Sequence, residues 1–393
     1  AMIQACKEVA EGKFDKEFVV DMIQGGAGTS TNMNANEVIA NRANEILGKA
    51  KGTYSPCHPN NHVNFAQSTN DAYPTAAKLG ISLNTPALID ELKSLISSFR
   101  KKAQELGDNI KMGRTQLQDA VPMTLGQEFE SYAASLENEI PQIQFARENL
   151  HTINMGATAI GTGINSDPNY TPKVTSHLAK ISGLDLKAAK NMIAATNDTS
   201  DFVTYSSELK RLSAKLSKIC SDLRLLSSGP RTGLYDISLP PMQPGSSIMP
   251  GKVNPVIPEV VNQVCYRVIG NDTAVILAAE SGQLELNVFE PVMIYSIFES
   301  IKLLINAMKT LRERCVTGIV GNYEHCKESV HRSIGLVTAL NPVIGYEASS
   351  DIAKTALRDN RSVYDLVLER GLLSKEKLDE VLKPENMTKP RKL

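Results

Sequence analysis

The sequence predicts an all-α protein: an elongated central bundle of long helices with smaller helical domains at its N- and C-terminal ends. The chain has no tryptophan and only 5% aromatic residues, and it contains few of the Val-rich alternating runs that form strands. Several long stretches are apolar around much of their circumference, so other helices must enclose them. A helix of about thirty residues is about 45 Å long, more than a small compact domain needs. Such helices indicate a bundle that also contacts partner subunits.

The helical pattern starts at once, because residues 1–6 already have the composition of a helix interior. Thr124 and Gln127 have the spacing of a capping box. Ser362 and Ser374 are suited to cap two short charged helices near the C-terminus. Further helical tracts are expected at 35–43, at 75–107 with a break near Pro86, at 124 to about 155, at about 191 to 228, and at 255 to about 315.

The length and hydrophobic content allow more than one domain. The 393 residues are 42% hydrophobic, enough for a large core and two or three domains. From Asn341 onward the helices become shorter and more charged. We expect an N-terminal domain at 1–67, truncated because the chain begins inside a helix, a central helix-bundle domain at 68–325 and a small C-terminal helical domain at 326–393.

Charge and cysteine usage exclude several classes of protein. The chain has 42 Lys and Arg against 43 Asp and Glu, a net charge of -1, so no overall field attracts nucleic acid or an anionic membrane. No apolar run reaches about 18 residues and no signal-type N-terminus is present. The six cysteines are scattered without a CxxC pair, which favours reduced thiols over a disulfide framework. We therefore expect a cytoplasmic protein with no nucleic-acid or membrane partner.

The most polar loop is the stretch 244–255, PGSSIMPGKVNP. It places two hydroxyls, an ammonium and an amide between helix-breaking residues, just before an apolar helical stretch for which Asn254 is a suitable N-cap. The N–H groups at a helix N-terminus favour an anion, and the charge of Lys252 adds to them. An ordinary interhelical loop would explain any one of these residues, but their combination favours an anion-binding loop.

Two other polar segments precede helices. Residues 24–34, QGGAGTSTNMN, combine three glycines with three hydroxyls, so backbone N–H groups can approach a ligand closely. A flexible connection with a Ser or Thr cap is the alternative, and no Gly-Lys-Ser/Thr follows, which excludes a Walker phosphate loop. Residues 67–71, QSTND, open a helix, and capping alone would explain one of the two hydroxyls.

Two further segments suggest sites that we reject. Cys57, His58 and His62 lie close together, but a zinc site needs a supporting second pair, and none follows at suitable spacing. Residues 155–165, MGATAIGTGIN, lack the third glycine, the preceding strand and the acidic partner of a dinucleotide-binding loop. Close backbone packing explains this segment better.

Residues 245–255, GSSIMPGKVNP, resemble the signature loop of the aspartase/fumarase superfamily, and the resemblance covers nearly the whole chain. It implies an L-aspartase-like fold in which this loop closes over a dicarboxylate and Ser246 is the catalytic base. The remaining substrate contacts implied by the resemblance are Thr29, Ser68, Thr69, Asn70, Thr115, Gln116, Ser247, Lys252 and Asn254. Of these, Asn70 would lie on the side of the leaving group.

Gln116 indicates which leaving group the site is suited to. The segment GRTQLQDAVP resembles aspartases, whereas fumarases ordinarily have His after the Thr. Ammonia leaves from an amine that is already protonated, while hydroxide needs a proton donor, so a neutral amide favours amine elimination. The resemblance thus implies anti-elimination of ammonia from L-aspartate to fumarate through an enediolate, with Ser246 activated by backbone donors and Lys252.

The resemblance also implies a homotetramer whose active sites combine loops of three subunits, and no organic cofactor. A divalent cation such as Mg²⁺ activates some aspartases, but no ligand set for it can be identified in the sequence. The alternatives are a class II fumarase acting on malate, a catalytically silent structural relative and a module that binds fumarate without turnover. A serine hydrolase is disfavoured because no His-Asp pair adjoins Ser246.

Overall fold

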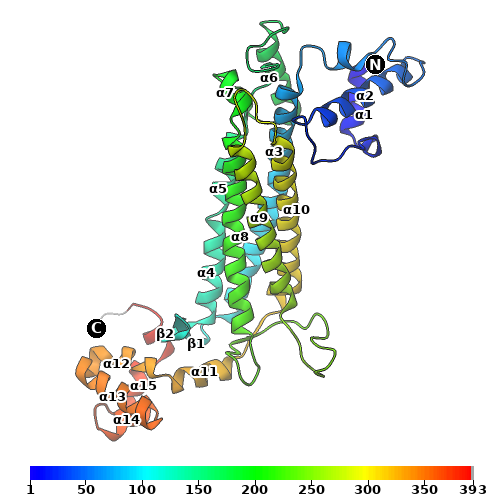
Figure 1. Ribbon diagram of the computed structural model, residues 1–393. Coiled ribbons are helices and arrows are strands. Elements are labelled where there is room, and N and C mark those ends of the chain that lie inside the picture. Colours follow the sequence, from blue (N-terminus) through cyan, green and yellow to red (C-terminus); the bar gives the residue numbers. More distant parts are fainter. Residues whose placement is uncertain (391–393) are drawn as a thin grey trace. The chain divides into compact units, whose positions relative to one another are not determined.

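A computed structural model describes residues 1–390, most of which are helical (Figure 1). The prediction of an all-α fold is confirmed. The helices are α1 (Met2–Ala10), α2 (Thr29–Ile46), α3 (Thr69–Leu106), α4 (Leu125–Glu137), α5 (Ile140–Asn149), α6 (Tyr170–Ser182), α7 (Met192–Asn197), α8 (Ser200–Leu226), α9 (Val256–Glu280), α10 (Glu290–Arg314), α11 (Tyr323–Arg332), α12 (Val337–Ile344), α13 (Tyr346–Asp359), α14 (Val363–Glu369), α15 (Lys375–Val381) and α16 (Pro384–Met387). Within residues 1–390, the strands form three two-stranded sheets: β1 (Ile110–Thr115) with β2 (Gln118–Thr124), β3 (Thr152–Ile153) with β4 (Lys187–Ala188), and β5 (Ile237–Ser238) with β6 (Val320–Gly321).

Local capping chemistry was predicted correctly. The Thr124 side chain accepts a hydrogen bond from the backbone N–H of Gln127, whose side chain accepts one in return from the Thr124 N–H. Ser362 and Ser374 cap α14 and α15 in the same manner as predicted. These caps satisfy N–H groups that the first helical turn leaves without partners.

The expected break near Pro86 is wrong, because α3 continues through it. Proline removes a helical hydrogen bond and frees the carbonyl four residues earlier. That carbonyl, on Ser82, accepts a hydrogen bond from Nε of Arg147 at 2.8 Å. A side chain from α5 thus replaces the missing donor, and the helix remains continuous.

The expected tract from 255 to about 315 is also wrong as one helix, because residues 281–289 separate α9 from α10. The buried Asn287 holds this turn: its amide donates to the carbonyl of Ala278 at 3.0 Å, and its Oδ1 accepts from the N–H of Phe289 at 2.9 Å. The tract from 124 to about 155 is likewise divided, into α4 and α5, and α2 begins at Thr29 rather than at residue 35.

The chain divides into two compact units. Unit 1 comprises Ala1–Asp90, Glu139–Ala214 and Val264–Ile305, and unit 2 comprises Glu91–Asn138, Lys215–Gln263 and Asn306–Leu393. The four long helices α3, α8, α9 and α10 each contribute residues to both units. The division into three domains at residues 67 and 325 stays a prediction.

In unit 1, polar contacts join the long helices. Thr85 of α3 and Tyr205 of α8 share a hydrogen bond of 2.7 Å between their buried hydroxyls. Asp272 of α9 accepts from Lys210 of α8 at 2.6 Å, and Asn271 of α9 donates to Ser300 of α10 at 3.1 Å. At the N-terminus, α1 packs on α2 (Figure 1). The polar pairs fix which helix faces meet.

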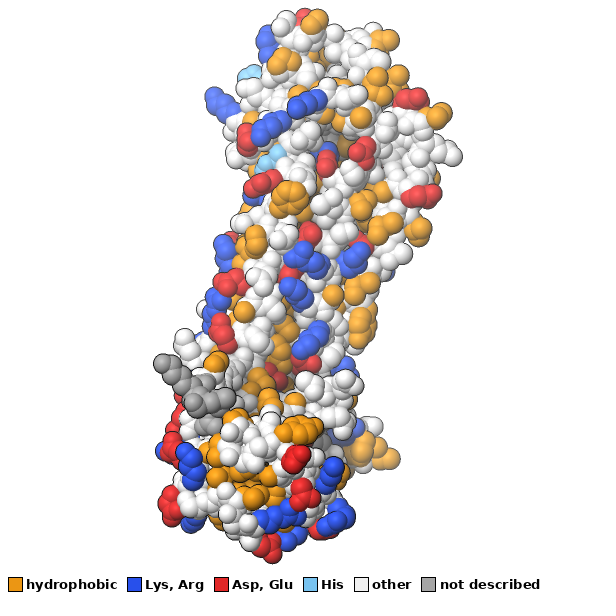
Figure 2. Space-filling model, turned by 90° about the vertical axis from the view of Figure 1, so that its left-hand side faces the viewer, with side chains coloured by type: hydrophobic (Ala, Val, Ile, Leu, Met, Phe, Trp, Pro, Cys, Tyr) orange, Lys and Arg blue, Asp and Glu red, His pale blue; other side chains and the backbone are white. Residues whose placement is uncertain are grey.

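Unit 2 has an aromatic cluster and a separate helical core. Phe99 of α3 packs against Phe129 and Tyr132 of α4, with ring centroids 6.2 and 5.8 Å apart. The helices after β6 form a core around buried residues such as Leu340, Ile352, Val367 and Leu378, onto which Met112 of β1 packs. On the face shown in Figure 2, Lys and Arg side chains lie among Asp and Glu side chains.

One helical segment within the described part of the chain, Glu290–Gly318, is long and apolar enough to cross a membrane by length and composition, with a mean hydropathy of 1.3. Of the most apolar 18-residue stretch of this segment, 56% is buried inside the molecule. Burial of this kind is typical of a core helix.

Candidate functional site

Ser68, Thr69 and Asn70 lie at the start of α3, where helical N–H groups have no partners within the helix. The hydroxyl of Ser68 accepts from the N–H of Asn70 at 3.2 Å, and Asp71 accepts from the N–H of Ser68 at 3.0 Å. This is the predicted capping arrangement. Among residues 1–390, the Ser68 hydroxyl is found as an acceptor and not as a donor.

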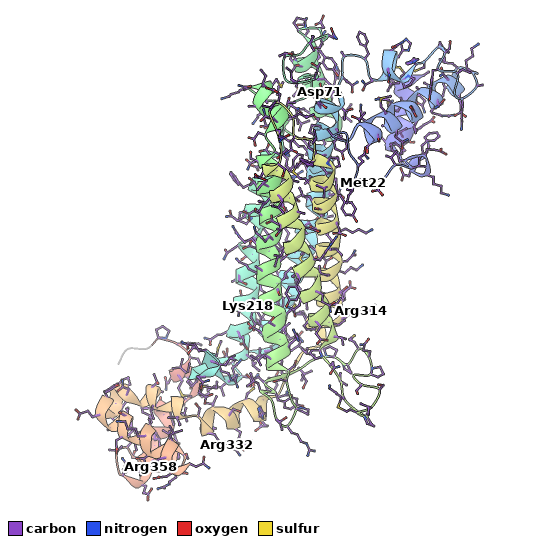
Figure 3. The ribbon with its side chains drawn as sticks, viewed as in Figure 1. Met22, Asp71, Lys218, Arg314, Arg332 and Arg358 are labelled. Carbon is purple, nitrogen blue, oxygen red and sulfur yellow. The ribbon has the colours of Figure 1, made fainter. Side chains whose placement is uncertain are left out.

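Asp71, labelled in Figure 3, connects this helix start to the segment 156–158 through hydrogen bonds. The side chain is 0% exposed, and its Oδ2 accepts from the N–H groups of Gly156 at 3.1 Å and Thr158 at 2.9 Å. Burial raises the pKa of the Asp71 carboxyl, and the backbone N–H groups oppose that rise. Asn70 adds a second tie through its amide, which donates to the carbonyl of Ala159 at 2.7 Å.

Thr29 comes close to this helix start through its neighbours on α2. Asn32 donates to the hydroxyl of Thr69 at 3.1 Å. Gly28 has a φ of +87° and lies so close to Tyr73 that a Cβ atom would be 2.6 Å from the ring, so only glycine fits there. These contacts place the start of α2 beside the start of α3 in unit 1, while the Thr29 hydroxyl itself donates to the carbonyl of Gly26 at 2.7 Å.

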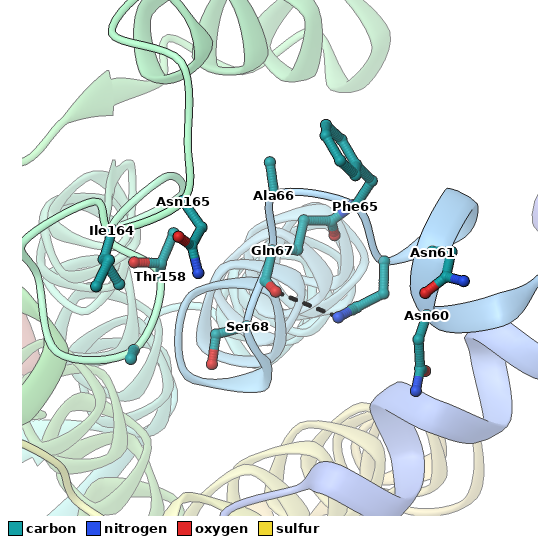
Figure 4. A pocket seen from close by; sticks show the side chains of 11 residues that line it. Asn60, Asn61, Phe65, Ala66, Gln67, Ser68, Thr158, Ile164 and Asn165 are labelled. Atoms are coloured by element: carbon teal, nitrogen blue, oxygen red, sulfur yellow. Dashed lines mark hydrogen bonds between the residues drawn. The ribbon is translucent and has the colours of Figure 1, made fainter.

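A cavity of about 530 Å³ adjoins Ser68 (Figure 4). Its polar lining includes Thr158 and the amides of Asn60, Asn61 and Asn165. Nδ1 of His58 accepts from the N–H groups of Asn60 and Asn61, at 3.1 and 3.3 Å. Over residues 1–390, no group of three or more His, Cys, Asp or Glu side chains is placed to hold a metal.

Thr115 and Gln116 lie at the tip of the β1–β2 hairpin in unit 2. Thr115 pairs with Gln118, and the two residues between them, Gln116 and Leu117, have φ angles of 53° and 62°. Tight hairpins require such left-handed turns but usually use Asn-Gly there. Left-handed backbone at two residues other than glycine stores strain, which is common where side chains have a functional task.

The loop that carries Ser246 is closed by its own hydrogen bonds. The N–H of Gly245 donates to the carbonyl of Lys252 at 2.8 Å, and the amide of Asn254 donates to the carbonyl of Gly245 at 2.8 Å. The hydroxyl oxygen of Ser246 accepts from the N–H groups of Ile248 and Met249, at 3.1 and 3.0 Å. A cavity of about 470 Å³ is lined by Ser246, Met249 and Lys252. Because α9 begins at Val256, Asn254 closes the loop rather than capping the helix directly.

A buried charge cluster lies behind the hairpin. Asp236 is 1% exposed and contacts Nζ of Lys111 at 3.1 Å and Nη1 of Arg114 at 2.6 Å. Lys111 also contacts Glu128 of α4 at 2.6 Å. The cluster thus joins β1 to the segment that leads into the Ser246 loop.

The predicted site residues thus form three groups. One contains Thr29, Ser68, Thr69 and Asn70, in unit 1. The second is the hairpin tip with Thr115 and Gln116, and the third is the loop with Ser246, Ser247, Lys252 and Asn254, both in unit 2. In the described part of the chain, no hydrogen bond or ion pair joins the hairpin tip to this loop.

Comparison with known proteins identifies the family. A family described as "Lyase" matches residues 1–270, and one described as "Fumarase C C-terminus" matches residues 336–389. The aspartate ammonia-lyase of Pseudomonas aeruginosa is 60% identical over 392 residues, which cover 100% of this chain and 83% of the relative. The chain belongs to the aspartase/fumarase superfamily. The aspartate ammonia-lyase of Bacillus subtilis is 51% identical over 390 residues, 99% of this chain and 82% of that superfamily member.

Solved structures of the aspartase/fumarase superfamily have the same fold. A fumarate lyase:delta crystallin from Brucella melitensis, bound to cobalt, matches with a TM-score of 0.96 at 52% identity, covering 99% of this chain and 84% of that chain. A class II fumarase from Schistosoma mansoni matches with a TM-score of 0.93 at 36% identity, covering 98% and 84%. The aspartate ammonia-lyase relatives and the lyase family match support a carbon–nitrogen lyase, as the sequence predicted.

Three residues around the candidate site were not selected from the sequence. Asp71 and Thr158 were passed over because a helix cap and a Gly-rich turn explained their segments. Asp236 was missed because its partners lie more than about 100 positions earlier in the chain, where no spacing rule applies. A buried acid among basic side chains becomes visible only in three dimensions.

Replacing Asp236 by alanine is expected to lower the free energy of unfolding by about 2–3 kcal/mol. Removing one member of a buried charge cluster leaves the others without a counter-charge, although Lys111 retains Glu128. The matched control is Asp185→Ala, which removes an exposed ion pair of the same length, 3.1 Å to Lys187, and should cost less than about 1 kcal/mol. Denaturant titration at one protein concentration measures both. Equal losses would contradict a buried cluster.

Proposed function

We propose that the chain is an aspartate ammonia-lyase that converts L-aspartate reversibly to fumarate and ammonium by anti-elimination. The observation that carries the proposal is the Ser246 hydroxyl oxygen, which accepts two backbone N–H groups in the loop that also carries Lys252. Donors aimed at this oxygen would stabilise its alkoxide and so lower its pKa.

In the proposed reaction, the Ser246 alkoxide removes a proton from the carbon next to the β-carboxylate. The electron pair moves into that carboxylate and forms a doubly charged enediolate, which needs converging hydrogen-bond donors. Thr29, Ser68, Thr69 and Ser247 are proposed to supply them, while Thr115, Lys252 and Asn254 hold the other carboxylate. The C–N bond then breaks, the electron pair returns to form the double bond, and ammonia leaves.

Two features support amine elimination rather than dehydration of malate. Gln116 has a neutral amide, which cannot donate a proton to a leaving hydroxide. Such an amide suits an amine, which is already protonated when it leaves. The strained turn places this amide at an exposed hairpin tip, where a substrate can reach it. Asn70 also lies on the proposed leaving-group side, with its amide nitrogen held by Ala159.

We further propose that the active enzyme is a homotetramer in which loops of three subunits form each active site. The exposed apolar residues of α9, including Val260, Tyr266, Ile276 and Leu277, are consistent with partner helices covering them. The cytoplasm is the proposed location. Every proposed step uses residues of the chain itself and no organic cofactor, and a divalent cation such as Mg²⁺ is proposed only as an activator.

The test supplies L-aspartate and L-malate separately and follows the ultraviolet absorbance of fumarate. We expect fumarate to form from L-aspartate, with ammonium in equal amount, and not from L-malate. Activity on malate alone would identify a fumarase and overturn the proposal. A folded tetramer inactive on both substrates would indicate a silent structural relative, which is the second outcome that contradicts it.

A further inference from the structure

Thr158 combines two unfavourable features. Its side chain is 5% exposed, and its hydroxyl has no hydrogen-bond partner among residues 1–390. A buried hydroxyl without a partner costs roughly 1–3 kcal/mol. Its backbone also has a φ of +58°, which is rare for a β-branched residue. Each such feature in a folded protein requires an explanation, and function is one of them.

The surrounding structure enforces this conformation. Asp71 fixes the N–H groups of Gly156 and Thr158 at 3.1 and 2.9 Å. Gly156 itself has a φ of +97°, and a Cβ there would lie 2.1 Å from the Thr171 hydroxyl. The turn therefore cannot relax to give Thr158 an ordinary backbone. A glycine or asparagine at position 158 would avoid the strain.

Thr158 and Ser68 line the same cavity, together with Asn165 (Figure 4). The Ser68 hydroxyl accepts from the N–H of Asn70 and is not found as a donor among residues 1–390. A carboxylate in this cavity could accept from both hydroxyls, since each of its oxygens has two acceptor sites. Such a contact would satisfy the Thr158 hydroxyl and explain why a threonine occupies a position suited to glycine.

We propose that Thr158 is a substrate-binding residue that donates a hydrogen bond to a carboxylate of the dicarboxylate substrate beside Ser68. This inference rests on the proposed function and adds a residue to its site. Asp71 holds the backbone of Thr158 in place before the substrate arrives, so little ordering remains to be done on binding.

Thr158→Val tests the proposal, because valine has the same shape without the hydroxyl. We expect the KM for L-aspartate and the dissociation constant of succinate, an unreactive dicarboxylate, to rise about 10-fold or more, as for a lost hydrogen bond to a charged group. Thr158→Ser should restore both values to within about 3-fold. The midpoint of thermal unfolding of Thr158→Val should stay level or rise, because an unpaired buried polar atom has been removed.

The matched control is Thr175→Val. Thr175 is also a buried threonine of unit 1 whose hydroxyl lacks a partner among the described residues, but it does not line the cavity. We expect KM and succinate binding to be unchanged in this variant. If Thr158→Val does not fold, Thr158→Gly, which suits the left-handed backbone, provides the same comparison.

The outcomes separate the two proposals. Wild-type protein that binds succinate while Thr158→Val binds it equally tightly would overturn the role of Thr158 and leave the proposed function standing. Wild-type protein that neither forms fumarate from L-aspartate nor binds succinate would overturn both. Equal weakening in Thr158→Val and Thr175→Val would assign Thr158 a merely structural role.

Discussion

Replacing Ser246 by alanine is expected to lower kcat for L-aspartate about 10³-fold, the size of effect typical of losing a positioned general base. Binding of succinate should remain within a few-fold of wild type, because the other donors and Lys252 are retained. The physical reason is the loss of the oxygen that accepts the substrate's proton: two backbone N–H groups donate to the Ser246 hydroxyl, and alanine has no oxygen there. Fumarate absorbance gives kcat, and calorimetry gives succinate affinity.

Ser131→Ala is the control for this variant. Ser131 is an exposed serine of α4 in the same unit, and its hydroxyl bonds only within its own helix, to Glu128 at 2.7 Å. We expect its activity to equal that of the wild type. If Ser246→Ala kept normal turnover, Ser246 would have no part in the mechanism, and the alkoxide chemistry would have to be abandoned.

Replacing Glu290 by glutamine is expected to stabilise the protein progressively as the pH rises. Glu290 is 3% exposed, and burial raises the pKa of its carboxyl to about 8, which the charge of Lys78 only partly opposes. In the unfolded chain this carboxyl loses its proton near the usual value of about 4.3. The folded wild type therefore holds a proton that the unfolded chain releases, and its stability falls from about pH 4 to about pH 8 and levels off above that.

Glutamine stays neutral throughout, so the advantage of Glu290→Gln over the wild type should grow by about 3 kcal/mol between about pH 5 and about pH 8. Urea titrations of both proteins across this range measure the difference, and titrations shared by the two proteins cancel. Glu285→Gln, on the exposed turn just before α10, controls for loss of one negative charge. A difference that stays constant or shrinks with pH would show that the Glu290 carboxyl is ionised in the folded protein.

Local chemistry accounts for the features that the sequence predicted well. The capping box at Thr124 and the serine caps at Ser362 and Ser374 were found because the groups involved lie within four positions of each other. The loop around Ser246 was identified because its polar residues are contiguous. Sequence patterns that span only a few residues form the same local structure in almost any tertiary context.

Features that depend on distant contacts were not predictable. Helix α3 passes Pro86 because Arg147, about 60 positions later, supplies a hydrogen bond to Ser82. The β1–β2 hairpin was missed because its turn has Gln116 and Leu117. The usual turn sequence, Asn-Gly, would have predicted a hairpin. The unusual backbone at Thr158, in the turn after β3, depends on Asp71, a partner from α3. In each case a tertiary contact decides against the local preference.

Each compact unit collects three separate stretches of the chain. No single cut can therefore release either unit as a continuous fragment, because segments of the two units alternate along the chain. A protease that cut the 281–289 turn would yield two pieces, each containing segments of both units. The Ser246 loop must consequently be exchanged between related proteins by replacing the loop alone within an intact chain, because the unit that carries it is not a continuous fragment.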